Sequence, residues 1–505
     1  MNLQEQLKEL ACRGLMLQPD GDQLRVKGPK QVLTPAVQSF LKQHKIELLK
    51  LLELESALPA PALTPITPSQ NAGDQYPLSF AQRRFWFLHQ LEPDTSVYHV
   101  SGGLEFRGIL QIQALERALS EIVQRHQILR TVFPETDGSP CQRVQDTASL
   151  SLRTEDLRDL RSSELEPQVE RLVNEVLHHP FDLRRGPLFR VRLLLLGPQR
   201  SQLLICLHHI IADGTSLEVF ARELGHLYRQ YAEGLTADLP GLAIQYNDYA
   251  CWQHAVISDQ RLQSQTAYWR QRLAGAPPLT TFPADASRPP TQSYRGAIER
   301  FTISAETIEP LRQIASQCDS TLFIALLSAY AVLLSKYTRQ PQVVLGTPVG
   351  NRPRQELEPL IGLFANTIAL HLDLTSAPTF TELLEQTREA VRGGLENQDI
   401  PFEQLVADLQ TDRDPSYSPV LQTMLVLRRE PLRLLDMGDI DVIGADVGQT
   451  TARLDSTLEL EERADGIAGT WEYASDLYRP ETVRRMIAHF QTLLHRLTDQ
   501  PDHPI

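Results

Sequence analysis

The stretch LLICLHHIIADG, residues 203–214, decides the fold of most of this chain. Its first five residues are all apolar, which predicts a strand buried on both faces. The apolar face of the periodic helix that follows comprises Leu217, Phe220, Ala221, Leu224, Leu227, Tyr228 and Tyr231. We therefore expect His208, His209 and Asp213 on a rigid strand-to-helix turn, beside the free N–H groups and the positive dipole end of the helix. Such a turn is suited to receiving an oxyanion.

The residues around this turn predict mixed α/β structure. Two apolar segments, 183–197 and 201–209, meet at the turn sequence GPQR and should pair as neighbouring strands. Apolar residues recur at helical spacing in 110–130 and again in 320–338. The segment PQVVLG (341–346) predicts one more buried strand.

Two Pro-rich stretches indicate how the chain is divided. The stretch 56–75 has the composition of a semi-stiff linker and separates a small N-terminal unit, 1–55, from the rest. A second stretch, 275–292, splits the remainder into halves of comparable size, 76–274 and 293–505. The fold class predicted for the large region is α/β (α+β), with two lobes facing each other across a cleft.

The N-terminal unit combines helical patterns with a hairpin. In LMLQPDGDQLRV (15–26), Asp20 and Gly21 supply turn chemistry between two alternating apolar arms. An amphipathic helix before the hairpin and a helix from about Pro35 to Leu54 after it complete the unit.

Composition excludes several classes of protein. A net charge of -14 argues against nucleic-acid binding, and no run of about 18 apolar residues predicts a membrane span. The five cysteines are scattered, without metal-ligand spacing, so no metal site is expected. The first 15 residues carry charges where a signal peptide would be apolar, so we expect a cytoplasmic protein.

Adjacent histidines alone do not define a site, because such a pair often simply ends a strand. The chain has a second pair, His178 and His179, with no Asp-Gly after it. HHIIADG (208–214), by contrast, resembles the HHxxxDG signature of condensation domains and of the wider chloramphenicol-acetyltransferase-like acyltransferases. Six further blocks resemble the condensation family in its order: SFAQRRFWFL (79–88), RHQILRTVF (125–133), YNDYACWQ (246–253), GTPVGNR (346–352), IGLFANT (361–367) and NQDIPFEQL (397–405).

This resemblance implies two chloramphenicol-acetyltransferase-like lobes that form a V with a central cleft. It implies that His209 is catalytic, that His208 and Gly214 shape the turn, and that Asp213 forms a structural ion pair with Arg352. An imidazole suits an amine nucleophile, either as a base or as a hydrogen-bond acceptor, and the residues do not decide between these roles. Asp213 could instead be the carboxylate of a catalytic triad.

The implied function is condensation in non-ribosomal peptide synthesis, in which an acceptor amine attacks a donor thioester. No carrier attachment site GxDS and no adenylation signature are found in the sequence. We therefore expect no cofactor bound by this chain, phosphopantetheine delivered by upstream donor and downstream acceptor carriers, and an adenylation domain beyond Ile505. Thr215 and Asn397 depart from the common family pattern and leave the donor stereochemistry open.

Residues 1–55 resemble tubulysin-type N-terminal docking domains of αββαα order. The expected docking edge includes Leu24, Arg25, Val26 and Lys27, which would pair with the C-terminal tail of an upstream synthetase. Arg25 and Lys27 could also be only a solvated edge. For the whole chain, two alternatives stay open: an acyltransferase that uses coenzyme A, and a catalytically silent recruitment platform.

Overall fold

The computed structural model describes residues 16–20, 23–27, 65–69, 75–146, 152–257, 259–377, 379–409, 414–429, 435–445, 447–448 and 451–505. The chain divides into two compact units, Met1–Pro65 and Ile66–Ile505. In the smaller unit, strands β1 (Met16–Asp20) and β2 (Gln23–Lys27) form the predicted antiparallel hairpin. The helices predicted before and after this hairpin lie outside the described residues.

The first lobe of the larger unit is built on a five-stranded sheet. Its strand order is β15 (Asp441–Ala445), β4 (His99–Arg107), β10 (Arg200–His208), β9 (Phe189–Gly197) and β8 (Arg153–Asp156). Strands β9 and β10 pair antiparallel, as their apolar sequences predicted. Every residue of β10 except Arg200 is buried, so the strand that leads to the turn is fixed inside the core.

Helices and a small sheet complete this lobe. The helices are α4 (Phe80–Leu91), α5 (Ile112–Arg125), α6 (Ser162–Leu177), α7 (Gly214–Ala232) and α8 (Tyr246–Val256). The small sheet has the order β3 (Gln75–Pro77), β7 (Ser139–Val144), β5 (Thr131–Val132), and β6 (Glu135–Thr136) also pairs with β7. Short 3-10 helices are η1 (Gln127–Arg130) and η2 (His209–Ile211).

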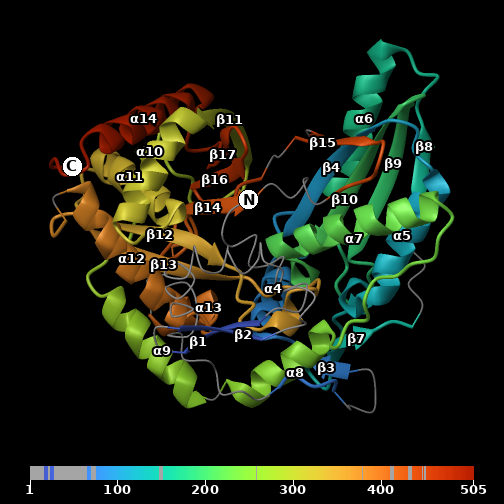
Figure 1. Cartoon of the computed structure of the whole chain (residues 1–505), viewed down its shortest axis with the longest axis horizontal. Helices are drawn as coiled ribbons and strands as arrows, with labels where there is room; N and C mark the ends of the chain where they lie inside the picture. Colours follow the sequence, from blue (N-terminus) through green and yellow to red (C-terminus); the bar gives the residue numbers. More distant parts are fainter. Residues whose placement is uncertain are drawn as a thin grey trace. The chain divides into compact units, whose positions relative to one another are not determined.

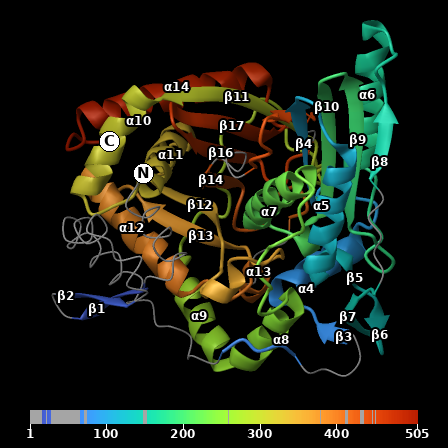
Figure 2. The same cartoon turned by 45° about the vertical axis from the view of Figure 1, so that its right-hand side comes forward.

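The second lobe is built on a six-stranded mixed sheet. The order is β11 (Gly296–Ser304), β17 (Gly466–Ala474), β16 (Ser456–Arg463), β14 (Thr423–Arg429), β12 (Gln342–Val349) and β13 (Asn366–Asp373). Its helices are α9 (Asp259–Arg272), α10 (Ala305–Gln317), α11 (Leu322–Thr338), α12 (Phe380–Glu396), α13 (Phe402–Asp408) and α14 (Pro480–Asp499). Figures 1 and 2 show α10, α11, α12 and α14 on the side of this sheet that is turned away from the first lobe.

Each lobe has its own hydrophobic core, but the chain crosses between them more than once. The crossing loop, residues 350–365 between β12 and β13, contains η3 (Gln355–Leu357) and leaves the second sheet. Its apolar side chains pack in the core of the first lobe: Leu357, Leu360, Ile361, Leu363 and Phe364. Strand β15 also comes from the second half of the chain and pairs antiparallel with β4.

The segment before the second Pro-rich stretch belongs to the second lobe. Trp269 and Leu273 are buried in the second core, although the sequence pattern assigned residues up to 274 to the first lobe. The indole N–H of Trp269 donates to the backbone oxygen of Asn397 at 2.8 Å. The change of lobe therefore comes before the Pro-rich stretch 275–292, and not at it. The sequence pattern missed this because composition does not reveal which core a helix joins.

Within the described ranges, no single helix has both the length and the apolar composition needed to span a membrane. Helices α10 and α11 reach that length and apolar composition only when they are taken together, and the chain bends by 105° at the break between them. Most of α11 is buried in the second core.

Candidate active site

The HHIIADG segment forms the tight turn that its sequence predicted. Strand β10 ends at His208, η2 starts at His209, and Asp213 is the N-cap of α7. His208 is 2% exposed, and its Nδ1 accepts a hydrogen bond from the backbone N–H of Ile210 at 3.0 Å. The backbone N–H of His209 donates to the carbonyl oxygen of Tyr98 at 2.8 Å. The turn is therefore held by its own first histidine and by the end of the neighbouring strand.

The His209 ring lies in an enclosed, weakly polar setting. It stacks on Phe85 of α4, with ring centroids 4.9 Å apart and an interplanar angle of 22°. Its Nδ1 is buried without a partner of normal hydrogen-bond geometry, although the residue's own carbonyl lies close enough to favour the protonated ring. Burial, and after it the charge of Arg453, lowers the pKa of His209 to about 3, against a smaller opposing effect of Asp213. The imidazole is therefore neutral near pH 7.

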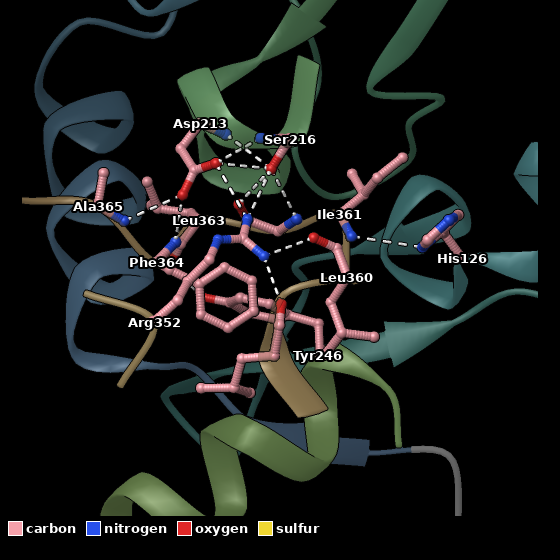
Figure 3. Close-up of polar contacts among 12 residues, drawn as sticks. His126, Asp213, Ser216, Tyr246, Arg352, Leu360, Ile361, Leu363, Phe364 and Ala365 are labelled. Carbon is pink, nitrogen blue, oxygen red and sulfur yellow. Dashed lines mark hydrogen bonds and ion pairs between the residues drawn. The ribbon is translucent and has the colours of Figure 1, made fainter. Parts of the chain in front are cut away.

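Asp213 is 1% exposed, and donors surround its carboxylate (Figure 3). Oδ1 accepts from the backbone N–H of Ser216 at 2.9 Å and from its hydroxyl at 2.7 Å. Oδ2 accepts from the backbone N–H groups of Phe364 and Ala365 at 3.0 and 3.1 Å. Because these last two residues belong to the crossing loop, Asp213 joins the helix of one lobe to the chain that enters the other.

The ion pair that the resemblance implied is present. A guanidinium nitrogen of Arg352 lies 3.2 Å from Oδ1 of Asp213, and both side chains are almost fully buried. Arg352 also donates to the carbonyl oxygens of Leu357 and Leu360 at 2.6 and 2.7 Å, and its guanidinium lies 4.0 Å from the ring centroid of Phe364 (Figure 3). Asp213 therefore has a structural partner and points into the loop, which does not match the imidazole-orienting role of a triad carboxylate.

Two further contacts hold the crossing loop against the first lobe. The hydroxyl of Tyr246 donates to the carbonyl oxygen of Leu363 at 2.5 Å. A Cβ added to Gly362 would lie 2.0 Å from Cδ2 of the same tyrosine, so only glycine fits at that position. His126 accepts from the backbone N–H of Ile361 at 3.4 Å (Figure 3). Its other ring nitrogen lies 2.8 Å from the carboxylate of Glu223.

The structure brings together His208, His209, Asp213, Gly214 and Arg352. Nothing lies within 4 Å of the position that a Cβ of Gly214 would take, so packing among the described residues does not demand glycine there. The docking residues Leu24, Arg25, Val26 and Lys27 all lie on β2. His178 and His179 follow α6 and contribute no acidic partner, in line with their interpretation as an incidental pair.

Sequence reasoning missed several residues of the site. Ser216 could have been found, because it completes a capping box with Asp213 three residues earlier. Phe85 and Tyr246 lie in recognised blocks, but their contacts with His209 and Leu363 join segments far apart in the chain. No local pattern pointed to Arg453. Among the described residues, no group of His, Cys, Asp or Glu side chains could hold a metal ion.

Two α/β lobes and a buried HHIIADG turn tied to the second half of the chain define a condensation-type domain. The Condensation domain family model matches residues 72–505, and the TubC N-terminal docking domain model matches residues 4–53. The chain belongs to the condensation-domain family of non-ribosomal peptide synthetases and has an N-terminal docking domain.

Relatives agree with this assignment. Malpinin synthetase of Mortierella alpina is 38% identical over 442 residues, which cover 87% of this chain but 6% of that protein. Phosphinothricin tripeptide synthetase PhsC of Streptomyces viridochromogenes is 37% identical, with 88% of this chain and 41% of the relative covered. The chain therefore spans only a part of the curated relatives that it matches.

Solved structures share the fold. The X-domain from teicoplanin biosynthesis superposes with a TM-score of 0.76 at 29% identity, covering 86% of this chain and 98% of that structure. A four-domain nonribosomal peptide synthetase bound to AMP and glycine gives a TM-score of 0.74 at 25% identity, covering 88% of this chain and 34% of that one.

We predict that Asp213→Ala is primarily a folding lesion. The change strands three backbone N–H groups and removes the charge partner of a buried guanidinium, so the free energy of unfolding should fall by about 3 to 5 kcal/mol. Arg352→Met should cost less, because the Asp213 carboxylate keeps its four other donors. Denaturant unfolding of both variants measures the difference. An Asp213→Ala protein that unfolds like the wild type yet is inactive would support a direct catalytic role instead.

Proposed function

We propose that this chain forms an amide bond between two thioester-linked substrates, with His209 as the catalytic residue. The observation that supports this proposal is a half-buried, neutral imidazole on a rigid turn, whose buried Nδ1 has no hydrogen-bond partner of normal geometry among the described residues. Such a ring can accept a proton or a hydrogen bond at Nε2. A neutral acceptor is what an attacking amine requires.

The reaction needs no nucleophile from the protein. The neutral α-amine of the acceptor attacks the carbonyl carbon of the donor thioester, and the carbonyl π electrons move to oxygen. The nitrogen then loses one proton, for which His209 is the acceptor or the hydrogen-bonding partner. Collapse of the intermediate breaks the carbon–sulfur bond, and the departing thiolate takes up a proton. Both acyl groups arrive activated, so aminolysis is direct.

The substrates require partner proteins. We propose that the phosphopantetheine arms of an upstream donor carrier and a downstream acceptor carrier deliver the two thioesters, and that an adenylation domain beyond Ile505 selects the acceptor. The support is the domain content of this sequence and its similarity to parts of much longer synthetases. An acyltransferase that uses coenzyme A would turn over free acyl-CoA with a free amine, which this proposal expects to be a poor reaction.

A recruitment platform is the second candidate, because one structural neighbour is the X-domain in a complex with OxyB from teicoplanin biosynthesis. The intact HHIIADG turn favours catalysis, since a platform has no chemical need for a desolvated, neutral histidine. Amide formation by the wild type decides between the two candidates.

We predict that His209→Ala lowers the rate of condensation between two loaded carriers by roughly 100- to 10,000-fold, because a positioned acid–base group is lost. The measurement is the mass of the product thioester on the acceptor carrier in a single turnover. His179→Ala is the matched control, since that ring is exposed and should leave the rate unchanged. Equal rates for His209→Ala and the wild type would contradict the mechanism.

The docking unit has its own proposed role. We propose that strand β2 receives the C-terminal tail of an upstream synthetase by β-strand addition, because a two-stranded hairpin leaves backbone groups of its outer edges unpaired. Arg25 and Lys27 alternate with Leu24 and Val26 along β2, so an acidic tail would gain charge complementarity as well as backbone pairing.

We predict that Arg25→Glu combined with Lys27→Glu abolishes binding of an acidic tail peptide and transfer from its carrier. Binding to the wild type should weaken as salt is raised, because the charges are screened. Condensation should persist in the variant when the donor carrier is fused before residue 76. Titration calorimetry at two salt concentrations measures the effect, and unchanged binding with unchanged salt dependence would place the docking face elsewhere.

A further inference from the structure

The expected oxyanion site at the start of α7 is already occupied. The carboxylate of Asp213 caps that helix, accepts the backbone N–H of Ser216, and is 1% exposed. A buried negative charge at a helix N-terminus cancels much of the positive dipole end. A second negative charge, on a substrate oxygen, would therefore gain little from this helix, and another positive group is needed near His209.

Arg453 lies in the segment that leads into β16, in the second half of the chain. Its backbone oxygen accepts from the side-chain amide of Gln292 at 2.8 Å. Just before it, the backbone N–H of Ala452 donates to the carbonyl oxygen of Tyr294 at 2.9 Å, and Thr451 forms an isolated bridge with Arg295. Residues 451–453 are thus fixed by backbone contacts from the stretch that precedes β11.

A cavity of about 400 Å³ connects this segment with the first lobe. Its walls include Thr451 and Tyr294 from the second lobe and Ser96 and Val97 from the first. The next residue after Val97 is Tyr98, whose carbonyl oxygen binds the backbone N–H of His209. The cavity therefore borders the residues that precede Tyr98 in the first lobe and the segment that carries Arg453 in the second.

Among the residues that the structure describes, the guanidinium of Arg453 is a cation without a partner. It makes no hydrogen bond or ion pair with any residue that the structure describes, and its side chain is solvent-accessible although protein surrounds it in the cleft. Burial lowers the pKa of His209 most, and the charge of Arg453 comes next, ahead of that of Arg84. The pKa of His208 is lowered mainly by burial and by neighbouring histidines, with a smaller effect of Arg453. Arg453 is therefore close enough to His209 for its charge to act on that ring.

The nearest acidic group does not fully neutralise it. Trp471 and Tyr473 are buried in the core of the second lobe, so Glu472 between them points to the other side of the sheet. Burial and the neighbouring Glu459 raise the pKa of Glu472 to about 7, despite the opposing charge of Arg453. Near pH 7 the Glu472 carboxyl is therefore about half ionised, so it compensates the charge of Arg453 only in part.

We propose that Arg453 is a catalytic residue that stabilises the oxyanion of the tetrahedral intermediate, an inference that rests on the proposed amide-forming function. When the amine nitrogen bonds to the carbonyl carbon, the former carbonyl oxygen becomes negative. The guanidinium donates hydrogen bonds to that oxygen from the second lobe while His209 acts on the nitrogen from the first. Collapse re-forms the carbonyl, expels the thiolate and returns Arg453 to its starting state.

The test compares single-turnover condensation rates of Arg453→Gln, Arg453→Lys and a matched control, Arg428→Gln. Arg428 is a cation of the same sheet, but it is paired with Glu459 at 3.2 Å. Loss of an oxyanion donor costs about 100- to 1,000-fold in kcat. We expect such a loss for Arg453→Gln at saturating carriers, with each KM changed less than about threefold, a smaller loss for Arg453→Lys, and a normal rate for Arg428→Gln.

Two results would overturn the inference alone: a wild-type kcat in Arg453→Gln, or a raised KM at unchanged kcat, which would mean ground-state binding only. Thermal melting shows whether Arg453→Gln is folded. If it is not, Arg453→Lys provides the test, because lysine retains the positive charge but lacks the planar guanidinium with its paired donors. A wild-type rate in Arg453→Lys would then count against binding of the oxyanion by the guanidinium. A wild-type chain that forms no amide would overturn the proposed function, and the inference with it.

Discussion

The carboxylate of Asp213 is the constraint on which the rest of the site depends. It accepts five hydrogen bonds, from Ser216, from Arg352 and from two backbone groups of the crossing loop. A buried carboxylate is stable only when its oxygens are satisfied in this way. Since the donors come from both halves of the chain, the same contacts that satisfy the charge also fix the start of α7 relative to the crossing loop.

The buried ion pair of Asp213 and Arg352 has a structural role and is distinct from His209, the proposed catalytic residue. Asp213 and Arg352 compensate each other in the interior, so Asp213 has only a secondary effect on His209, whose pKa burial lowers to about 3. A neutral imidazole can serve an amine at physiological pH, whereas a protonated one would repel the ammonium form of the acceptor and could accept nothing. The resting site therefore offers His209 as an acceptor, and within the described part of the chain the guanidinium of Arg453 has no partner.

Local sequence was enough to predict the elements that carry the motif. The apolar run before His208 forms β10, the periodic segment after Gly214 forms α7, and the Asp–Gly turn at residues 20–21 separates β1 from β2. Each of these features depends on neighbours within a few residues.

What could not be predicted depends on contacts between distant segments. The crossing loop is apolar like any core segment, and nothing in its composition tells which lobe it enters. Helix α9 was assigned to the wrong lobe for the same reason. Arg453 lies in a stretch without periodicity or motif, so its position near His209 appears only when β16, β11 and the end of β10 are placed together. The recognised blocks pointed to His209 but not to the charges that surround it.

The central claim, that His209 is held neutral by burial in a turn fixed through Asp213, is tested most directly by a nitrogen-15 NMR titration of the histidine rings between pH 8 and 5. The His209 signal, assigned from the His209→Ala spectrum, should show a neutral ring with no titration across this range, because its pKa of about 3 lies well below it. The exposed ring of His179 reports in the same spectra whether the titration itself works. A His209 ring that takes up a proton with a midpoint near the ordinary histidine value of about 6.5 would contradict the account.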